Sequence, residues 1–395
     1  MAERREGWEP EDGSAWLEAD PVAHLPKPDG QDSEVTFRIA EELSQGLLRL
    51  PVAMRRQAWR EREIFAAFRR LGFRLGRLEG RAWLGVGRRD VAGVRQLVAV
   101  FSVELTIPPD SESFRRSLDI PEFFFVPSIV APAEEVPVPI FVEQAQSPSR
   151  YGTVSPGDWA LGSSPEAVAT LPPTQSGDAI SGEDEYGLAS DGTLTAIVSR
   201  KGDDLPLLLS AEHILGPIGR SVIADRPNKS KVAVVVDSDC RLDAAIAEPI
   251  GPFHLDYRAK AANNMVPAAY IPPTSDMPVQ MWGARSNYQQ GFIDQALRVP
   301  ATAGRIGLLT PFSARLRSGP GDSGALILSG HGQAPALIAD TQLAAGTDAG
   351  ELSGAMLGML LAGPSPKIAD PTLEVWAVPL IEILERFGLQ VWVRA

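Results

Sequence analysis

Cysteine is almost absent from this chain of 395 residues, since Cys240 is the only one. No disulfide can therefore form within the chain, and we expect a reducing compartment. Histidine is also scarce, with four residues in all. Because zinc sites are built mostly from clustered histidine and cysteine side chains, we predict no metal site and no cofactor.

Long apolar runs are also missing. The longest candidate, AMLGMLLA at 355–362, has the length of a strand and not of a membrane span. The first residues, MAERREGWEPEDGS, contain no apolar stretch of signal-peptide length. The net charge of −13 repels nucleic-acid backbones and anionic lipid. We therefore expect a cytoplasmic protein whose partners are neither nucleic acid nor membrane.

The composition is that of a globular protein, with 44% hydrophobic and 22% charged residues, and the length predicts two or three domains. Changes in composition along the chain suggest four parts. We expect a flexible acidic tail at 1–33, a small α+β accessory domain at 34–144, a linker rich in Ser, Pro, Gly and acidic residues at 145–191, and a β-rich domain at 192–395.

Two helices are predicted near the start of the accessory domain. Apolar residues recur at helical spacing from Val35 to Leu50, and a second helix is expected from Pro51 to about Leu71. The stretch 51–95 holds twelve arginines against four acidic residues. It predicts either a solvated helix face or a docking face for an acidic partner. A regulatory partner could thus bind through this domain.

From Gly192 onward, apolar segments of strand length alternate with turns, and WAVPLIEILERFG near the end returns to helical spacing. Many short strands without intervening helices indicate a β-barrel or sandwich with one C-terminal helix. The predicted class is therefore mainly β.

The segment SGPGDSGALIL at 318–328 suits a nucleophilic serine. Gly321 lets the backbone bend so that its N–H and that of Ser323 can point at one spot and form an oxyanion hole. Gly324 leaves room for a substrate backbone. The tetrapeptide GDSG alone is short enough to occur by chance, so it needs partners.

A serine nucleophile needs a base, and only four histidines are available. His213 ends an apolar strand where the chain turns, which favours a half-buried imidazole. His24 lies in the tail, and His254 and His331 lie in turn-like contexts. Asp243 opens a short apolar strand and is the best candidate to orient the imidazole, with Asp237 and Asp239 as rivals in a polar turn.

His213 in SAEH, Asp243 in DAAIA and Ser323 in GDSGA follow one another in the order His, Asp, Ser. In this order the motifs resemble the trypsin-like, chymotrypsin-fold serine peptidases, specifically the compact intracellular bacterial and plant type. The similarity covers about residues 190–395, and the region before 145 loosely resembles the small domain that precedes the peptidase in some of these proteins. The resemblance implies two antiparallel β-barrels with the catalytic residues between them.

The resemblance also implies substrate-binding residues. Leu361, Ala362 and Gly363 would lie on the edge that pairs with an extended substrate. Arg317, six residues before Ser323, would lie at the base of the primary pocket and favour an acidic side chain, unless it is simply exposed on a loop.

Three departures from the family pattern stand out. Glu212 replaces a small residue, and the segment 329–354 is long. No site marks the freed N-terminus that activates digestive relatives, although cleavage within 145–191 could create one and the chain could be latent until then.

The sequence therefore predicts a regulated serine endopeptidase that acts on a protein substrate. Analogy with the family adds that it could activate an effector in a bacterial defence or stress pathway. Two alternatives are a catalytically silent, peptidase-like binding module and an esterase-type acyl hydrolase. The hydrolysis of peptide and ester substrates would separate them.

Overall fold

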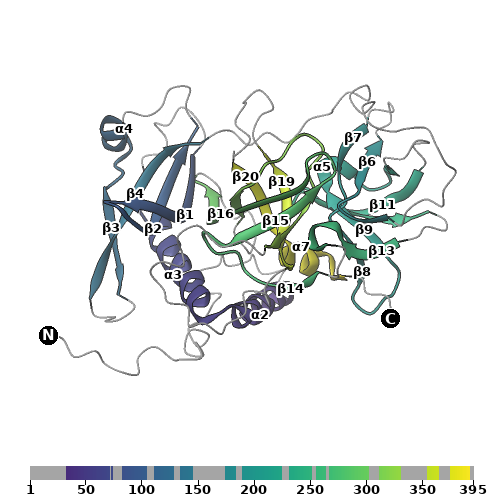
Figure 1. Cartoon of the computed structure of the whole chain (residues 1–395), viewed down its shortest axis with the longest axis horizontal. Helices are drawn as coiled ribbons and strands as arrows, with labels where there is room; N and C mark the ends of the chain where they lie inside the picture. The colour runs from purple at the N-terminus through teal and green to yellow at the C-terminus, as the bar shows by residue number, and fades with distance from the viewer. Residues whose placement is uncertain are drawn as a thin grey trace.

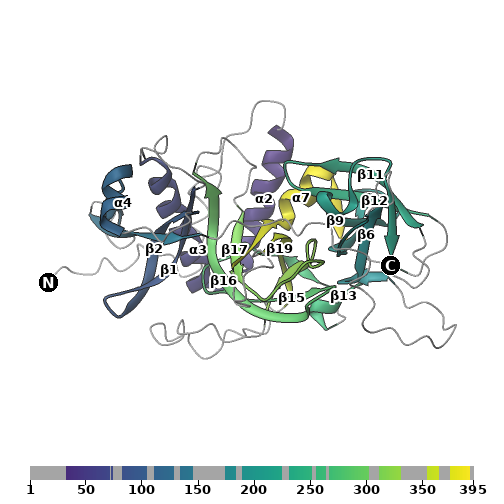
Figure 2. The same ribbon diagram turned by 90° about the horizontal axis from the view of Figure 1, so that it is seen from above.

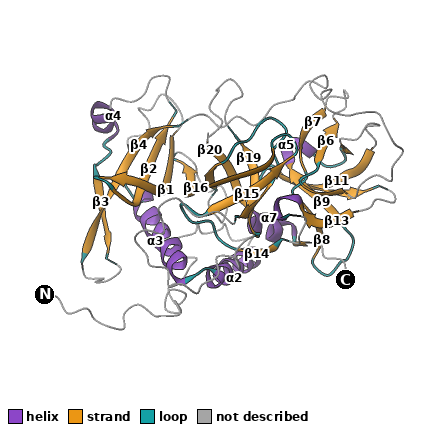
Figure 3. Cartoon of the chain, in the orientation of Figure 1, coloured by secondary structure: helices purple, strands orange, loops and turns teal. Residues whose placement is uncertain are grey.

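A computed structural model describes thirteen parts of the chain: 33–71, 73, 82–104, 111–128, 134–145, 174–183, 189–224, 231–250, 255–263, 267–301, 311–330, 354–363 and 374–391. The tail expected at 1–33 lies outside these residues except for Ser33, as do His24, His254, His331 and most of the segment 329–354. Strands dominate the described structure, and helices are few (Figure 3).

Six strands in the C-terminal half close into a barrel at the centre of the molecule (Figure 1). They pair in the order β15, β18, β19, β20, β17, β16, and β16 pairs back onto β15. Their bounds are β15 Pro278–Gly283, β16 Asn287–Pro300, β17 Phe312–Arg315, β18 Leu326–Ser329, β19 Ala355–Ala362 and β20 Glu374–Pro379. A short strand, β14 (Ala268–Tyr270), pairs in parallel with β19.

A second, open sheet of eight strands curves beside this barrel. Its order is β21 (Leu389–Val391), β8 (Ala196–Arg200), β9 (Leu207–Ala211), β12 (Ala244–Pro249), β11 (Lys231–Asp239), β10 (Ser221–Ala224), β6 (Ala179–Glu183) and β7 (Ala189–Thr193). Two further strands, β5 (Thr174–Ser176) and β13 (Leu255–Ala259), pair in parallel, and the 3₁₀ turn η3 (Lys260–Ala262) follows. Buried aliphatic side chains such as Leu209 and Ile246 fill the concave face.

Helix α7 (Leu380–Phe387) joins the two sheets. It follows β20 of the closed barrel directly, ends at Gly388 with a φ of +63°, and leads into β21 of the open sheet. The predicted mainly β fold with a barrel and a C-terminal helix is confirmed: the six-stranded barrel is closed, and the open sheet forms a half-barrel beside it. The two barrel-forming sheets are therefore tied together at the end of the chain as well as across the site described below.

The segment 145–191 differs from the expected linker. Strands β5 and β6, and the start of β7, all lie within it: β6 and β7 belong to the open sheet, and β5 pairs with β13. These strands read AISGE and ASDGT, so they carry little apolar alternation. Backbone hydrogen bonds to neighbouring strands hold them, and such pairing leaves no hydrophobic signal in the sequence.

The N-terminal region consists of helices α2 (Ser33–Arg49), α3 (Val52–Arg69) and α4 (Ser111–Leu118) and strands β1 (Ala82–Val91), β2 (Val94–Val103), β3 (Phe123–Pro127) and β4 (Glu135–Gln144). Strand β1 pairs with β16, so the barrel sheet continues as β16-β1-β2-β4-β3. Helix α2 lies beside α7 (Figure 2), where Arg38 pairs with Glu385 at 3.1 Å. The accessory region thus shares its sheet and its core with the closed barrel.

The arginines of α3 differ from both sequence interpretations, because several of them are buried. Arg55 donates to the carbonyl oxygens of Leu47, Leu48 and Leu50 at 2.9–3.1 Å, at the C-terminal end of α2. Arg62 is also buried and donates to the Ala58 carbonyl at 2.7 Å. These guanidinium groups donate to carbonyl oxygens within the molecule, and Arg55 in particular binds carbonyls at the end of α2, so they face neither water nor a docking partner.

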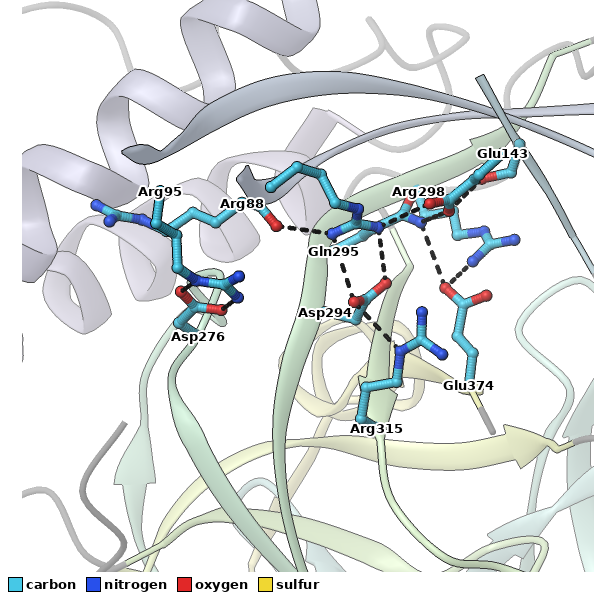
Figure 4. Close-up of polar contacts among 11 residues, drawn as sticks. Arg88, Arg95, Glu143, Asp276, Asp294, Gln295, Arg298, Arg315 and Glu374 are labelled. Carbon is cyan, nitrogen blue, oxygen red and sulfur yellow. Dashed lines mark hydrogen bonds and ion pairs between the residues drawn. The ribbon is translucent and has the colours of Figure 1, made fainter. Parts of the chain in front are cut away.

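A partly buried group of charges joins the N-terminal sheet to the closed barrel (Figure 4). We call it the N-terminal seam, and it consists of Arg89, Glu143, Asp294, Arg298, Arg315 and Glu374. Arg89 bridges Glu143 at 3.0 Å and Asp294 at 3.2 Å, so β1, β4 and β16 are linked by one guanidinium. Arg298 pairs with Glu374 and lies over the rings of Trp83 and Trp376. Three positive charges therefore face three negative ones.

Candidate active site

His213 and Asp243 lie close together because one follows the end of strand β9 and the other precedes the start of its neighbour β12. Strands β9 and β12 pair with Ala211 opposite Ala244, so the residues next to them in the chain lie close together. His213 sits in α5 (Glu212–Leu215), a single helical turn after β9. Asp243 precedes β12 with a φ of +52°, which carries its carboxylate towards that turn.

The contact between the two side chains fixes the imidazole. His213 Nδ1 lies 2.8 Å from Asp243 Oδ2, and the backbone N–H of His213 donates to Asp243 Oδ1 at 3.0 Å. Their side chains are 12% and 5% exposed. Because a carboxylate only accepts hydrogen bonds, Nδ1 carries the proton and Nε2 is left as the basic nitrogen of the neutral ring.

The two rival aspartates, Asp237 and Asp239, make contacts with residues other than His213. Asp239 Oδ1 accepts from the amides of Arg241 and Leu242, which closes its turn. The side chain of Asp237 is 40% exposed and lies 3.8 Å from Arg200. Of the three candidates weighed from the sequence, Asp243 is the one that contacts His213. Glu212 donates its backbone N–H to the Asp243 carbonyl at 3.0 Å and so supports the same turn.

Ser323 lies in a loop of two consecutive β-turns, residues 319–325, which we call the Ser323 loop. The amide of Asp322 donates to the Gly319 carbonyl at 3.1 Å, and that of Ala325 donates to the Asp322 carbonyl at 2.9 Å. Gly321 and Gly324 each hold the third position of a turn, with φ of +100° and +90°. Proline followed by a residue of positive φ is the arrangement of a type II turn, which explains why Gly321 follows Pro320.

Two backbone amides beside Ser323 are free to bind an anion. Within the described part of the chain, neither the Gly321 nor the Ser323 N–H donates to another group. Both residues are buried. Unpaired buried amides are uncommon in folded proteins, and here they belong to the two residues predicted to form an oxyanion hole.

Asp322 holds the Ser323 loop to its surroundings. Its Oδ1 accepts from the amides of Arg285 and Ser286 at 2.9 and 3.0 Å, and its Oδ2 accepts from that of Gly319 at 2.7 Å. Gly283 permits this approach, since a Cβ there would lie 2.2 Å from Oδ1. Burial raises the pKa of Asp322, although these amide hydrogen bonds act to lower it. Neutral dipoles, not a cation, thus stabilise this carboxylate.

The hydroxyl of Ser323 does not bind the imidazole in this conformation. Ser323 Oγ donates to the Leu361 carbonyl at 3.2 Å, and His213 Nε2 is buried without a hydrogen-bond partner among the described residues. In this structure Asp243 therefore contacts His213, and the Ser323 hydroxyl contacts Leu361. Catalytic hydrogen bonds are often absent in unliganded enzymes and form when substrate binds.

Of the expected substrate-binding residues, Leu361 and Ala362 end β19, Gly363 follows that strand, and Arg317 lies between β17 and the Ser323 loop. Strands β18 and β19 pair only as far as Leu326 opposite Met359, so Leu361, Ala362 and Gly363 have no strand partner on that side in the described residues. Arg317 is exposed, and its guanidinium has no partner in the residues that the structure describes. Sequence reasoning missed Thr193, whose hydroxyl contacts the Ser323 loop.

Across the described ranges, no three His, Cys, Asp or Glu side chains gather in a way that could hold a metal ion. The same ranges contain no helix of the length and apolarity that a membrane span needs.

The sequence matches no protein-family model and no curated protein. Solved structures resemble about half of it. A chymotrypsin from Cellulomonas bogoriensis is 15% identical over 55% of this chain and 97% of its own, with a TM-score of 0.38. A Nocardiopsis protease is 14% identical over 55% and 98%, with a TM-score of 0.39. A glutamic acid specific serine protease is 15% identical over 55% and 100%, with a TM-score of 0.41. These likenesses concern the fold.

Proposed function

We propose that this chain is a serine endopeptidase that uses Ser323 as nucleophile, His213 as general base and Asp243 as the residue that orients the imidazole. The observation that carries the proposal is the pairing of His213 with Asp243 at 2.8 Å, together with the amides of Gly321 and Ser323, which have no acceptor among the described residues. A base with a fixed tautomer and a pair of free N–H donors beside a serine are the parts that acyl transfer requires.

In this mechanism the substrate lies along the free edge of Leu361–Gly363, and its backbone N–H competes with the Ser323 hydroxyl for the Leu361 carbonyl. The released hydroxyl turns to His213 Nε2, which takes its proton as Oγ attacks the scissile carbonyl. The resulting oxyanion accepts from the N–H groups of Gly321 and Ser323. His213 then returns the proton to the leaving amine, and water hydrolyses the acyl-enzyme.

Activation by a freed N-terminus is not part of the proposal. Such a terminus would supply an ammonium group to the aspartate beside the serine, but Asp322 already accepts from three backbone amides. We propose instead that the resting contact of Ser323 with Leu361 is relieved by substrate. The intracellular setting, a regulatory partner at the N-terminal region, and a role in activating an effector in a bacterial defence or stress pathway rest on composition and family analogy.

We also propose a preference for Asp or Glu before the scissile bond. The support is the place of Arg317 six residues before Ser323, since exposure alone also fits a plain loop residue. Its guanidinium has no partner in the residues that the structure describes and is open to a substrate. A carboxylate of the substrate would form a charge-assisted hydrogen bond with it. Replacing Arg317 by Gln should reduce the ratio of cleavage after Glu to cleavage after Gln, measured on matched peptides.

A catalytically silent binding module is the second candidate, and the observation in its favour is that the Ser323 hydroxyl is bound to Leu361. Hydrolysis of a peptide library and of a p-nitrophenyl ester by the wild type and Ser323→Ala separates the possibilities. Cleavage of internal peptide bonds that Ser323→Ala abolishes supports the endopeptidase. Turnover of esters alone indicates an acyl hydrolase, and no turnover of either by the folded wild type indicates the binding module.

A further inference from the structure

Thr193 touches the Ser323 loop from the opposite sheet. Its hydroxyl donates to the Gly321 carbonyl at 2.9 Å, and its backbone N–H donates to the Ser323 carbonyl at 2.8 Å. The hydroxyl also accepts from the amide of Ala284 at 2.9 Å. Thr193 is 0% exposed, so water does not compete for these hydrogen bonds.

These contacts connect the open sheet to the closed barrel. Thr193 ends β7 of the open sheet, which also carries His213 and Asp243, whereas Ser323 and Ala284 belong to the closed barrel. The carbonyl of Thr193 in turn accepts from the hydroxyl of Ser210 at 2.7 Å, and Ser210 lies on β9, three residues before His213. A short path of hydrogen bonds therefore runs from the strand of the base to the loop of the nucleophile.

The Ser323 loop needs such an anchor, because glycines at 321 and 324 give it unusual backbone freedom. Thr193 binds the carbonyls of Gly321 and Ser323, and the N–H of Ser323 lies in the peptide group between them. Holding both flanking carbonyls fixes the direction of that N–H. It also fixes where Oγ stands relative to the imidazole.

We propose that Thr193 is a positioning residue, whose hydroxyl sets the Ser323 loop in register with His213 for the reaction. The inference rests on the proposed function, since the register matters only if Ser323 attacks and its N–H stabilises the oxyanion. A misplacement of about 1 Å at a reacting group can cost about 100-fold in rate. Thr193 itself touches no reacting atom.

The test compares Thr193→Val with Thr193→Ser in the full-length chain. Valine keeps the branched shape and the backbone N–H but removes the hydroxyl, while serine keeps the hydroxyl. We expect kcat to fall by about 10- to 100-fold in Thr193→Val, with KM within about 3-fold, and Thr193→Ser to stay close to the wild type.

A matched control is Ser181→Ala in the neighbouring strand β6. Its buried hydroxyl donates to Asp191 at 2.5 Å, away from the Ser323 loop. This variant also loses a hydroxyl hydrogen bond from a buried side chain, here to a carboxylate and not to a backbone carbonyl, and should keep kcat within about 3-fold of the wild type. Equal losses of kcat in Ser181→Ala and Thr193→Val would overturn the proposal, because general destabilisation would then explain both.

A second measurement needs no turnover. The amide of Ala325 closes the second turn of the Ser323 loop, and its hydrogen exchange reports how well the loop is held. We expect exchange at least 10-fold faster in Thr193→Val and unchanged in Thr193→Ser and Ser181→Ala. Unchanged exchange in Thr193→Val would overturn the inference about Thr193 even if the wild type proved inactive, and inactivity alone would overturn only the proposed function.

Discussion

The closed barrel is joined to its two neighbours by very different contacts. Towards the open sheet, the Ser323 loop is held by hydroxyls and backbone groups, as when Thr193 binds the Gly321 carbonyl at 2.9 Å. Towards the N-terminal sheet, the N-terminal seam is held by three arginines and three carboxylates. Directional hydrogen bonds place individual atoms, whereas a balanced, partly buried charge network specifies which surfaces meet.

Two buried aspartates show the difference at the level of single groups. Burial raises the pKa of Asp322, because its partners are neutral amides that only partly offset the loss of water. Burial acts on Asp294 in the same direction, but the charges of Arg89 and Arg315 outweigh it and hold the pKa of Asp294 below its usual value. The Asp322 carboxylate is thus stabilised by hydrogen bonds from neutral amides, and the Asp294 carboxylate by the positive charges of arginines.

The largest expected effect separates the two regions by activity. Asp243→Asn should lower kcat by about 10³- to 10⁴-fold, because the imidazole loses its acceptor and with it the favoured tautomer. Glu143→Gln in the N-terminal seam should leave kcat of the folded protein within about 10-fold. Steady-state hydrolysis of one peptide substrate by both variants checks this. A loss in Glu143→Gln as large as in Asp243→Asn would erase the distinction.

The next effect concerns stability. Arg298 is fully buried and pairs with Glu374, which is 15% exposed. Burial lowers the pKa of Arg298 to about 9, against the raising effect of Glu143 and Asp294. Removing it as Arg298→Met leaves the mostly buried carboxylate of Glu374 without this cationic partner, although Gln295 still donates to it at 3.4 Å, and should cost about 3–5 kcal/mol in the free energy of unfolding.

Urea unfolding measures that cost, and the double variant Arg298→Met, Glu374→Gln is its control. Because the double variant carries no stranded charge, it should recover part of the loss. A double variant no more stable than Arg298→Met would show that packing against Trp83 and Trp376, rather than charge, dominates at Arg298.

A smaller effect is expected where Arg55 binds the last carbonyls of α2. Arg55→Ala removes hydrogen bonds to three carbonyl oxygens and should lower the free energy of unfolding by about 1–2 kcal/mol. Arg69→Ala, an exposed arginine on the same helix whose contact is with the ring of Phe65, should change it by less than about 0.5 kcal/mol. Equal values would mean that the Arg55 contacts add nothing to the helix.

The smallest expected effect is on the pH dependence of stability, where Asp322 and Asp294 should act in opposite directions. Asp322 has a folded pKa above its ordinary 3.8, so the wild type should gain stability over Asp322→Asn as the pH falls from neutral towards 3.8. Asp294 has a folded pKa below 3.8, so the advantage of the wild type over Asp294→Asn is present above 3.8 and is lost as the pH falls below it. Denaturant unfolding across pH 3–7 should give slopes of opposite sign, and slopes of one sign would contradict the assignment.

The sequence was most informative where residue types are rare and their order is specific. With four histidines and one GDSG segment, few pairs of base and nucleophile were possible, and the predicted base His213 does contact Asp243. The mainly β class and the C-terminal helix followed from strand-length apolar segments and a final helical period. Such patterns record which side chains are buried.

The sequence was least informative where backbone pairing or a distant partner decides the structure. Strands β6 and β7 contain too many small and acidic residues to show apolar alternation. The pairing of β1 with β16 joins residues more than two hundred positions apart, and no local pattern encodes it. The charge of Arg55 and Arg89 was visible, but whether they face water or carbonyls and carboxylates depends on neighbours that only the fold supplies.

The most direct test of the proposed chemistry is labelling of the full-length protein with a fluorophosphonate, read as intact mass with the adduct mapped by peptide. We expect one adduct per chain on Ser323, absent in Ser323→Ala and formed at least 100-fold more slowly in His213→Ala. No adduct on the folded wild type, or an adduct that persists in Ser323→Ala, would contradict an assembled nucleophile and base.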